Sequence, residues 1–196
     1  MLPPKLSKDA EKKTLVIDLD ETLVHSSFTP IDNPDLMLKV SLNNLLNDHQ
    51  VELENRVCEV FVMVRPGTDK FLQRMSLFYE LVIFTASLSK YAQPLMKQLD
   101  PHDYCGTQLY REHCTFYNGV FVKDMSKLGR PLKDAIILDN SPLSYLFQPE
   151  NGMPIKNWYD DKSDQELTYY IPLLERLAFV NDIREYIPRM VKDNEI

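Results

Sequence analysis

The chain is poor in cysteine. Its 196 residues include only Cys58, Cys105 and Cys114, and no two of them form a C-x-x-C motif. An odd number of cysteines without metal-ligand spacing argues against a disulfide framework and against a structural zinc site. This usage is typical of a reducing compartment, so we expect an intracellular protein.

Long apolar runs and a surplus of positive charge are also missing. No run is long enough to span a bilayer, and the polar start MLPPKLSKDAEKK lacks the apolar core of a signal peptide. The formal net charge of −7 argues against non-specific binding to nucleic acid or anionic lipid. The sequence therefore predicts neither a membrane segment nor a direct nucleic-acid partner.

What is present is an ordinary globular composition, 44% hydrophobic and 26% charged. This length suits one domain with a sizeable core. We predict a tail over residues 1–12 and a single domain over residues 13–196.

Short apolar runs alternate with helical patterns along the chain. Residues 13–19, 79–85 and 135–139 are nearly continuous apolar runs, and 68–78 and 89–98 have helical spacing. Buried strands separated by helices are joined by crossovers and lie parallel. The sequence therefore predicts an α/β fold: a Rossmann-like, mostly parallel sheet flanked by helices.

Smaller features complete the predicted architecture. Residues 36–42 and 57–64 have strand patterns, which indicates a small β insertion over about 36–64. The Asn118-Gly119 pair predicts a β-hairpin, and Ser163-x-x-Glu166 is a capping box that opens a helix. No long extra segment separates the motifs, so we expect no large cap domain.

Polar groups stand where the three apolar runs end: Asp18 and Asp20, then Thr85, then Asp139 and Asn140. In parallel sheets, ligands bind beyond the carboxyl ends of the strands, so these groups should converge. A half-buried cluster of carboxylates requires a cation, and Mg²⁺ prefers such hard oxygen ligands. The sequence therefore predicts a magnesium site.

The spacing of Asp18 and Asp20 suggests chemistry as well as metal binding. Two carboxylates can face one reaction centre, one attacking phosphorus to form an aspartyl-phosphate while the other transfers a proton. Phosphoryl transfer also needs groups that bind the phosphoryl oxygens. Candidates for that role are Lys123, Arg111 and the Thr85 hydroxyl.

These residues carry a family resemblance. DLDET, residues 18–22, resembles the D-x-D-x-[TV] motif of the haloacid dehalogenase superfamily, and DLDETLVHSS resembles the small C-terminal-domain phosphatases. The latter are also called NLI-interacting-factor-like phosphatases and act on the RNA polymerase II tail. The resemblance runs from about Lys13 to the C-terminus and includes, in order, RPG, LVIFTASLSKYA, LYREHC, VKDMSKLGR, ILDNSP and NWYDD.

The resemblance implies specific roles. Asp18 would be the nucleophile and Asp20 the general acid and base. Mg²⁺ would be held by Asp18, the Asp20 carbonyl and Asn140, with Asp139 near it through water. The phosphate would contact Thr85, Arg111 and Lys123. An apolar pocket for a proline-directed phosphoserine would comprise Phe28, Val40, Leu42, Leu88 and Tyr91.

The same resemblance implies a nuclear protein whose partner is a phosphorylated protein segment. The stretch between Val40 and Phe61 is longer than the compact strand–turn–strand expected there, which affects the substrate most. Two alternatives stay open: the same chemistry on another phosphoprotein or a small metabolite, and a non-catalytic scaffold on the same fold. Taken singly, Thr85 could be a helix N-cap, and Asp139-Asn140-Ser141 an Asx turn.

Overall fold

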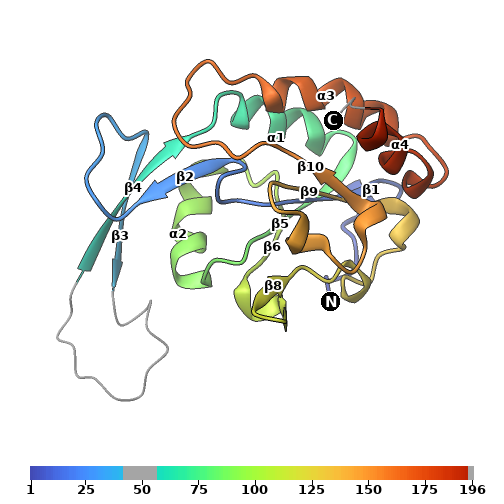
Figure 1. The fold of residues 1–196 in the computed structure, drawn as a ribbon, viewed down its shortest axis with the longest axis horizontal. Helices are drawn as coiled ribbons and strands as arrows, with labels where there is room; N and C mark the ends of the chain where they lie inside the picture. The colour runs from blue at the N-terminus through green and yellow to red at the C-terminus, as the bar shows by residue number, and fades with distance from the viewer. Residues whose placement is uncertain (42–56, 194–196) are drawn as a thin grey trace.

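The protein is described by a computed structural model that places residues 1–41 and 57–193. Its centre is a five-stranded sheet in the order β10-β9-β1-β5-β6, and every neighbouring pair is parallel (Figure 1). The parallel sheet follows from the apolar runs identified in the sequence. Its strands are β1 (Lys13–Ile17), β5 (Tyr79–Phe84), β6 (Thr107–Leu109), β9 (Ala135–Asp139) and β10 (Gly152–Pro154).

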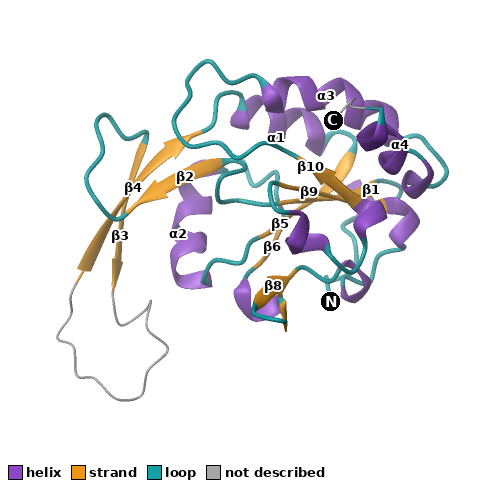
Figure 2. Cartoon of the chain, viewed as in Figure 1, coloured by secondary structure: helices purple, strands orange, loops and turns teal. Residues whose placement is uncertain are grey.

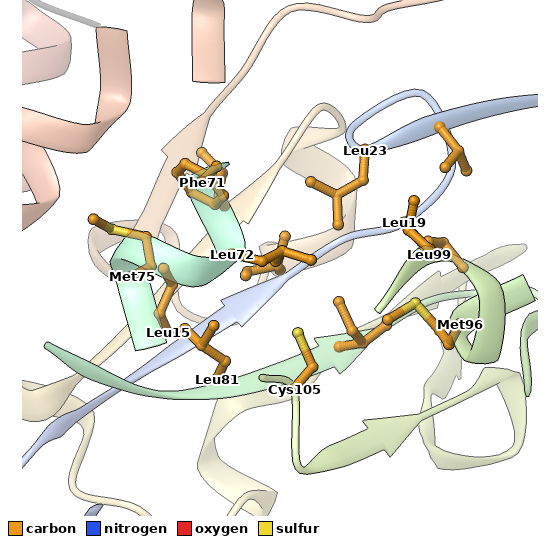
Figure 3. Packing of buried hydrophobic residues seen from close by; sticks show 14 of the residues in the cluster. Leu15, Leu19, Leu23, Phe71, Leu72, Met75, Leu81, Met96, Leu99 and Cys105 are labelled. Carbon is orange, nitrogen blue, oxygen red and sulfur yellow. The ribbon is translucent and has the colours of Figure 1, made fainter. Parts of the chain in front are cut away.

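The two faces of this sheet are covered differently. Leu15 and Ile17 point into a large core shared with the helices, part of which, including Leu15, is drawn in Figure 3. Val16 points into a smaller core on the other face. The helices of the large core are α1 (Thr68–Ser76), α2 (Ser89–Leu99) and α3 (Glu166–Leu177), with Ile187 added by α4 (Ile187–Lys192). The smaller core is closed by short 3₁₀ turns, among them η4 (Met125–Lys127) and η6 (Pro142–Tyr145).

The N-terminal segment, predicted as a tail over residues 1–12, is instead packed against the domain at Leu2. Leu2 is buried in the smaller core, and its N–H donates to the Leu128 carbonyl over 2.9 Å. The 3₁₀ turn η1 (Ser7–Asp9) leads from there to β1. Leu2 holds the segment in place, because it supplies an apolar side chain to a core that short 3₁₀ turns close among the described residues.

A second sheet projects from the central one (Figures 1 and 2). It is antiparallel, in the order β2-β4-β3, with β2 (Val24–Ser27), β3 (Leu36–Ser41) and β4 (Val57–Val64). The insertion predicted over 36–64 supplies two of its strands, and the sequence analysis missed β2. We call these three strands the insertion sheet.

The predicted hairpin is present as β7 (Thr115–Tyr117) and β8 (Val120–Val122). Asn118 and Gly119 have φ values of 46° and 84°, the left-handed conformation that a type I′ turn requires.

The helix predicted after Ser163 begins without the expected capping box. Helix α3 begins at Glu166, whose N–H donates to Asp164 rather than to Ser163. After the 3₁₀ turn η8 (Ile183–Glu185), α4 (Ile187–Lys192) ends the described chain. Among residues 1–41 and 57–193, no helix has the length and hydropathy that a bilayer span requires.

Candidate active site

Three charged side chains from distant parts of the chain meet at the carboxyl ends of β1 and β9. Lys123 Nζ lies 2.5 Å from Asp18 Oδ1 and 2.6 Å from Asp139 Oδ2. All three are buried, with Lys123 and Asp139 each 1% exposed and Asp18 6%. We call this group the charged centre. It forms because β1 and β9 are neighbours in the sheet and the hairpin delivers Lys123 above their ends.

Negative charge exceeds positive charge in this centre. Burial raises the pKa of Asp18 to about 7, and repulsion from Asp139 and Asp20 adds to it, although Lys123 opposes the shift. Burial also lowers the pKa of Lys123, but attraction to Asp18 and Asp139 outweighs it and leaves that pKa above its ordinary value. Lys123 is therefore held as a cation, and the site still has room for further positive charge.

The oxygen atoms beside Asp18 fit Mg²⁺. Thr22 Oγ1 lies 3.0 Å from Asp18 Oδ2 and 3.3 Å from Asn140 Oδ1, so two hard oxygen ligands from two strand ends gather around one hydroxyl. The Asn140 amide nitrogen donates to Asn157 Oδ1 over 2.8 Å, which leaves its oxygen directed toward Thr22.

Softer metals fit this site less well. The described residues contain no group of three or more His, Cys, Asp or Glu side chains that could hold a metal ion by themselves. A site built from one carboxylate, one amide oxygen and main-chain or water oxygens suits Mg²⁺ and not a softer metal.

Asp20 has entirely different neighbours from Asp18. Its Oδ2 accepts from Ser87 Oγ at 2.7 Å and Thr85 Oγ1 at 3.1 Å, and its Oδ1 accepts from Tyr91 OH at 2.9 Å. The Tyr91 hydroxyl also lies 2.5 Å from Ser26 Oγ. We call Ser26, Thr85, Ser87 and Tyr91 the hydroxyl cluster.

A sharp turn separates the two aspartates. Glu21 has a φ of 57°, which costs a residue with a side chain about 1 kcal/mol. Its N–H donates to Val24, its carbonyl accepts from Trp158, and its carboxylate lies 3.1 Å from His25 Nδ1. The turn takes Asp20 out of line with β1, so the two carboxyl groups face different surroundings.

The hydroxyl of Thr85, a predicted phosphate contact, donates to Asp20 Oδ2 over 3.1 Å in the structure. It also accepts from the Ser87 N–H over 2.9 Å. Ser26 and Ser87 were missed as site residues. Ser87 follows Thr85 in the FTAS motif, so that motif was the signal available for it.

An open cleft of about 350 Å³ borders Asp20. Of the predicted apolar pocket, Phe28, Leu88 and Tyr91 line this cleft, together with Arg111. Arg111 is held by its Nε donating to the Ala86 carbonyl over 2.6 Å and by stacking 5.0 Å above the Phe121 ring. Its two terminal nitrogens have no partner among the described residues and are available to an anion.

Two predicted pocket residues are not in this cleft. Val40 is 2% exposed and belongs to the large core, because alternation along β3 turns it toward α2. It is therefore a core residue and not a substrate contact. Leu42 lies outside the described residues.

Comparison with known proteins identifies the family. A model of the NLI interacting factor-like phosphatases matches residues 13–184. The chain belongs to this family. The NLI interacting factor-like phosphatase assignment confirms the predicted resemblance, and with the parallel sheet it confirms the predicted fold class.

Individual relatives agree with the family assignment. Phosphatase Herzog of Drosophila melanogaster is 45% identical over 183 residues, which cover 93% of this chain and 49% of that protein. The human Carboxy-terminal domain RNA polymerase II polypeptide A small phosphatase 1 is also 45% identical over 183 residues, covering 93% and 66%. The chain thus spans about half to two thirds of the length of these relatives.

A solved structure supports the fold alone. Fcp1, described as an essential RNA polymerase II CTD phosphatase, aligns with a TM-score of 0.71 at 15% identity. The alignment covers 92% of this chain and 70% of that chain.

Proposed function

We propose that this chain is a Mg²⁺-dependent protein serine/threonine phosphatase that acts through an aspartyl-phosphate on Asp18. The observation that carries the proposal is that the two aspartates after β1 have different surroundings. Asp18 lies buried against Lys123, while Asp20 lies apart on an open cleft. This pairs a nucleophile next to a fixed cation with a proton carrier next to the substrate.

In the first step, a carboxylate oxygen of Asp18 attacks the phosphorus of a phosphoserine, and the bond from phosphorus to the serine oxygen breaks. Asp20 gives its proton to the departing serine oxygen. Lys123 and the free nitrogens of Arg111 supply positive charge to the phosphoryl oxygens from two sides.

In the second step, water attacks the phosphorus and Asp20 takes its proton. The bond between phosphorus and Asp18 breaks, which releases inorganic phosphate and restores the carboxylate. Bound Mg²⁺, held by Asp18, Asn140 and the Asp20 carbonyl, would supply further positive charge to the phosphoryl group.

The cleft favours a protein substrate over a metabolite. It is open to solvent, and its walls include the exposed ring of Phe28 and the side chain of Leu88. The names of the relatives point to the RNA polymerase II tail, so we propose tail phosphoserine as the substrate and the nucleus as its location. If the substrate is instead another phosphoprotein, the two chemical steps are the same.

Hydrolysis of an aryl phosphate with and without Mg²⁺ tests the chemistry. We expect Mg²⁺-dependent turnover that disappears in Asp18→Asn, and a structure with BeF₃⁻ bound to Asp18 within reach of Lys123. An inert protein at every metal concentration would support the scaffold alternative. Faster turnover of sugar phosphates than of tail phosphopeptides would overturn the protein substrate.

A further inference from the structure

Lys123 is fixed by its main chain as well as by its ion pairs. It is the first residue after β8, and its N–H donates to the Ser144 carbonyl over 2.7 Å. Ser144 belongs to η6, which follows Asp139 in the chain. The segment that bears Lys123 is therefore bonded directly to the segment that bears Asp139, independently of the charges between them.

A buried side chain joins the same two segments a second time. Gln148 is 8% exposed and lies just beyond η6, and its Oε1 accepts from the Met125 N–H over 2.9 Å. Its Nε2 donates to Asp124 Oδ1 over 3.1 Å. One amide group thus holds the two residues that directly follow Lys123, and both of its polar atoms take part.

Asp124 belongs to a turn that is closed by its own hydrogen bonds. It is the N-cap of η4, and its Oδ1 accepts from the Ser126 hydroxyl over 2.6 Å and from the Ser126 N–H over 3.2 Å. Gln148 therefore holds the start of a capped turn, and a shift of that turn would move Lys123 with it.

The lysine stem alone does not fix the ammonium group above Asp18. A lysine presents a point charge on a flexible four-carbon stem. Its Nζ lies between two carboxylates, 2.5 Å from Asp18 and 2.6 Å from Asp139. Because a displacement of about 1 Å at a reaction centre can lower a rate about 10²-fold, the main chain from which this stem starts has to be held in place.

We propose that Gln148 is a positioning residue for the reaction. It locks the start of η4 onto the segment after β9, and so holds the Lys123 ammonium group where the phosphoryl oxygens gain charge. The hydrogen bonds of its side chain end on Asp124 and Met125, so it acts through Lys123 and not on the substrate. This rests on the proposed function and adds a residue to it.

Aryl phosphate hydrolysis with Mg²⁺ by Gln148→Met tests this role. Methionine keeps the length of the side chain and removes the amide donor and acceptor. We expect kcat to fall about 10–100-fold and KM to change less than about threefold, because a displaced charge matters most in the transition state. Gln148→His should recover most of the rate, since a neutral imidazole again offers one acceptor and one donor.

Asn151→Leu is the matched control for a loss that is only structural. Asn151 is 0% exposed, and its Nδ2 donates to the Leu132 and Ala135 carbonyls over 2.6 and 2.7 Å, so it also holds main chain through one buried amide. Ala135 begins β9, whereas Asp139 ends it. The variant should lower the melting temperature as Gln148→Met does, while kcat per folded molecule stays unchanged.

Two further variants keep the test decisive even where Gln148→Met does not fold. Gln148→Glu keeps the acceptor for Met125 and loses the donor to Asp124, so it should also lower kcat. In a Lys123→Met background, by contrast, neither substitution of Gln148 should lower the remaining rate further, because the cation that Gln148 positions is absent.

The outcomes separate this inference from the proposed function. The role of Gln148 is overturned by an unchanged kcat in folded Gln148→Met or Gln148→Glu, by no recovery in folded Gln148→His, by an equal loss of kcat in Asn151→Leu, or by an equal further loss in the Lys123→Met background. Mg²⁺-dependent hydrolysis by the unaltered protein would then still support the proposed function. Absence of any hydrolysis by the unaltered protein overturns the proposed function itself.

Discussion

The charged centre and the hydroxyl cluster hold two aspartates of one short motif in opposite ways. Asp18 is buried against a lysine and a second carboxylate, whereas Asp20 is held by neutral hydroxyls at an open cleft. A buried carboxylate fixed by charge keeps its position and cannot move far. One held by neutral hydrogen bonds can exchange partners at lower cost, as a proton carrier must. This difference in surroundings supports the different roles proposed for the two acids.

The largest expected effect comes from removing the lysine of the charged centre. Lys123→Met keeps the apolar stem but leaves Asp18 and Asp139 buried without a cation, which should cost about 3–5 kcal/mol of unfolding free energy. Activity should fall about 10²–10³-fold, since charge stabilisation is lost. Urea unfolding and aryl phosphate hydrolysis measure the two effects.

Lys127→Met is the matched control for that variant. Its side chain is 62% exposed, and its Nζ lies 3.4 Å from Asp124, so the cost should stay below about 1 kcal/mol. Equal losses of unfolding free energy in Lys123→Met and Lys127→Met would show that Lys123 stabilises the protein no more than a surface lysine does.

The next effect concerns pH. Because the folded pKa of Asp18 is raised to about 7 from 3.8, the metal-free folded state binds a proton that the unfolded state has lost between these values. Stability should therefore fall as pH rises from about 4 to 7, by at most about 1.4 kcal/mol per pH unit. Asp18→Asn should flatten this slope, and unfolding in chelator across that range measures it. An unchanged slope would contradict the raised pKa.

A smaller effect, on Mg²⁺ affinity, is expected from removing the hydrogen-bond acceptor that orients the Asn140 amide. Asn157→Leu removes the acceptor for its nitrogen, which should weaken Mg²⁺ binding about tenfold. Asn157→Asp keeps an acceptor and should retain binding. The shift of melting temperature with Mg²⁺ concentration measures affinity without turnover. Equal shifts in both variants would show that Asn157 does not position Asn140.

The smallest effect lies in the hydroxyl cluster. Tyr91→Phe removes one of the three donors to Asp20, which should lower the rate about 3–10-fold. The loss should be greater for a phosphoserine peptide than for an aryl phosphate, whose leaving group needs less protonation. Tyr117→Phe, at an exposed tyrosine of the hairpin, is the control. Equal losses on both substrates would argue against a role through Asp20.

Sequence patterns were most informative for residues at the ends of parallel strands, because such strands run in the same direction and end at the same edge of the sheet. The strand ends carry Asp18 and Asp139, and neighbouring parallel strands bring such ends together without further information. Val40 was assigned to the substrate pocket by the family resemblance alone, whereas alternation along β3 turns its side chain into the large core. Leu2 was missed because a lone leucine in a polar stretch has no periodicity to mark it as core.

The sequence by itself determined the acids and their spacing, the apolar strands that they follow, and the family whose motifs they share. These are local patterns, read from residues a few positions apart. Only the tertiary structure decided that Lys123 bridges Asp18 and Asp139, that three hydroxyl side chains donate to Asp20, and that Phe28 lines two grooves. Those facts depend on packing between segments up to 105 residues apart, which no local period encodes.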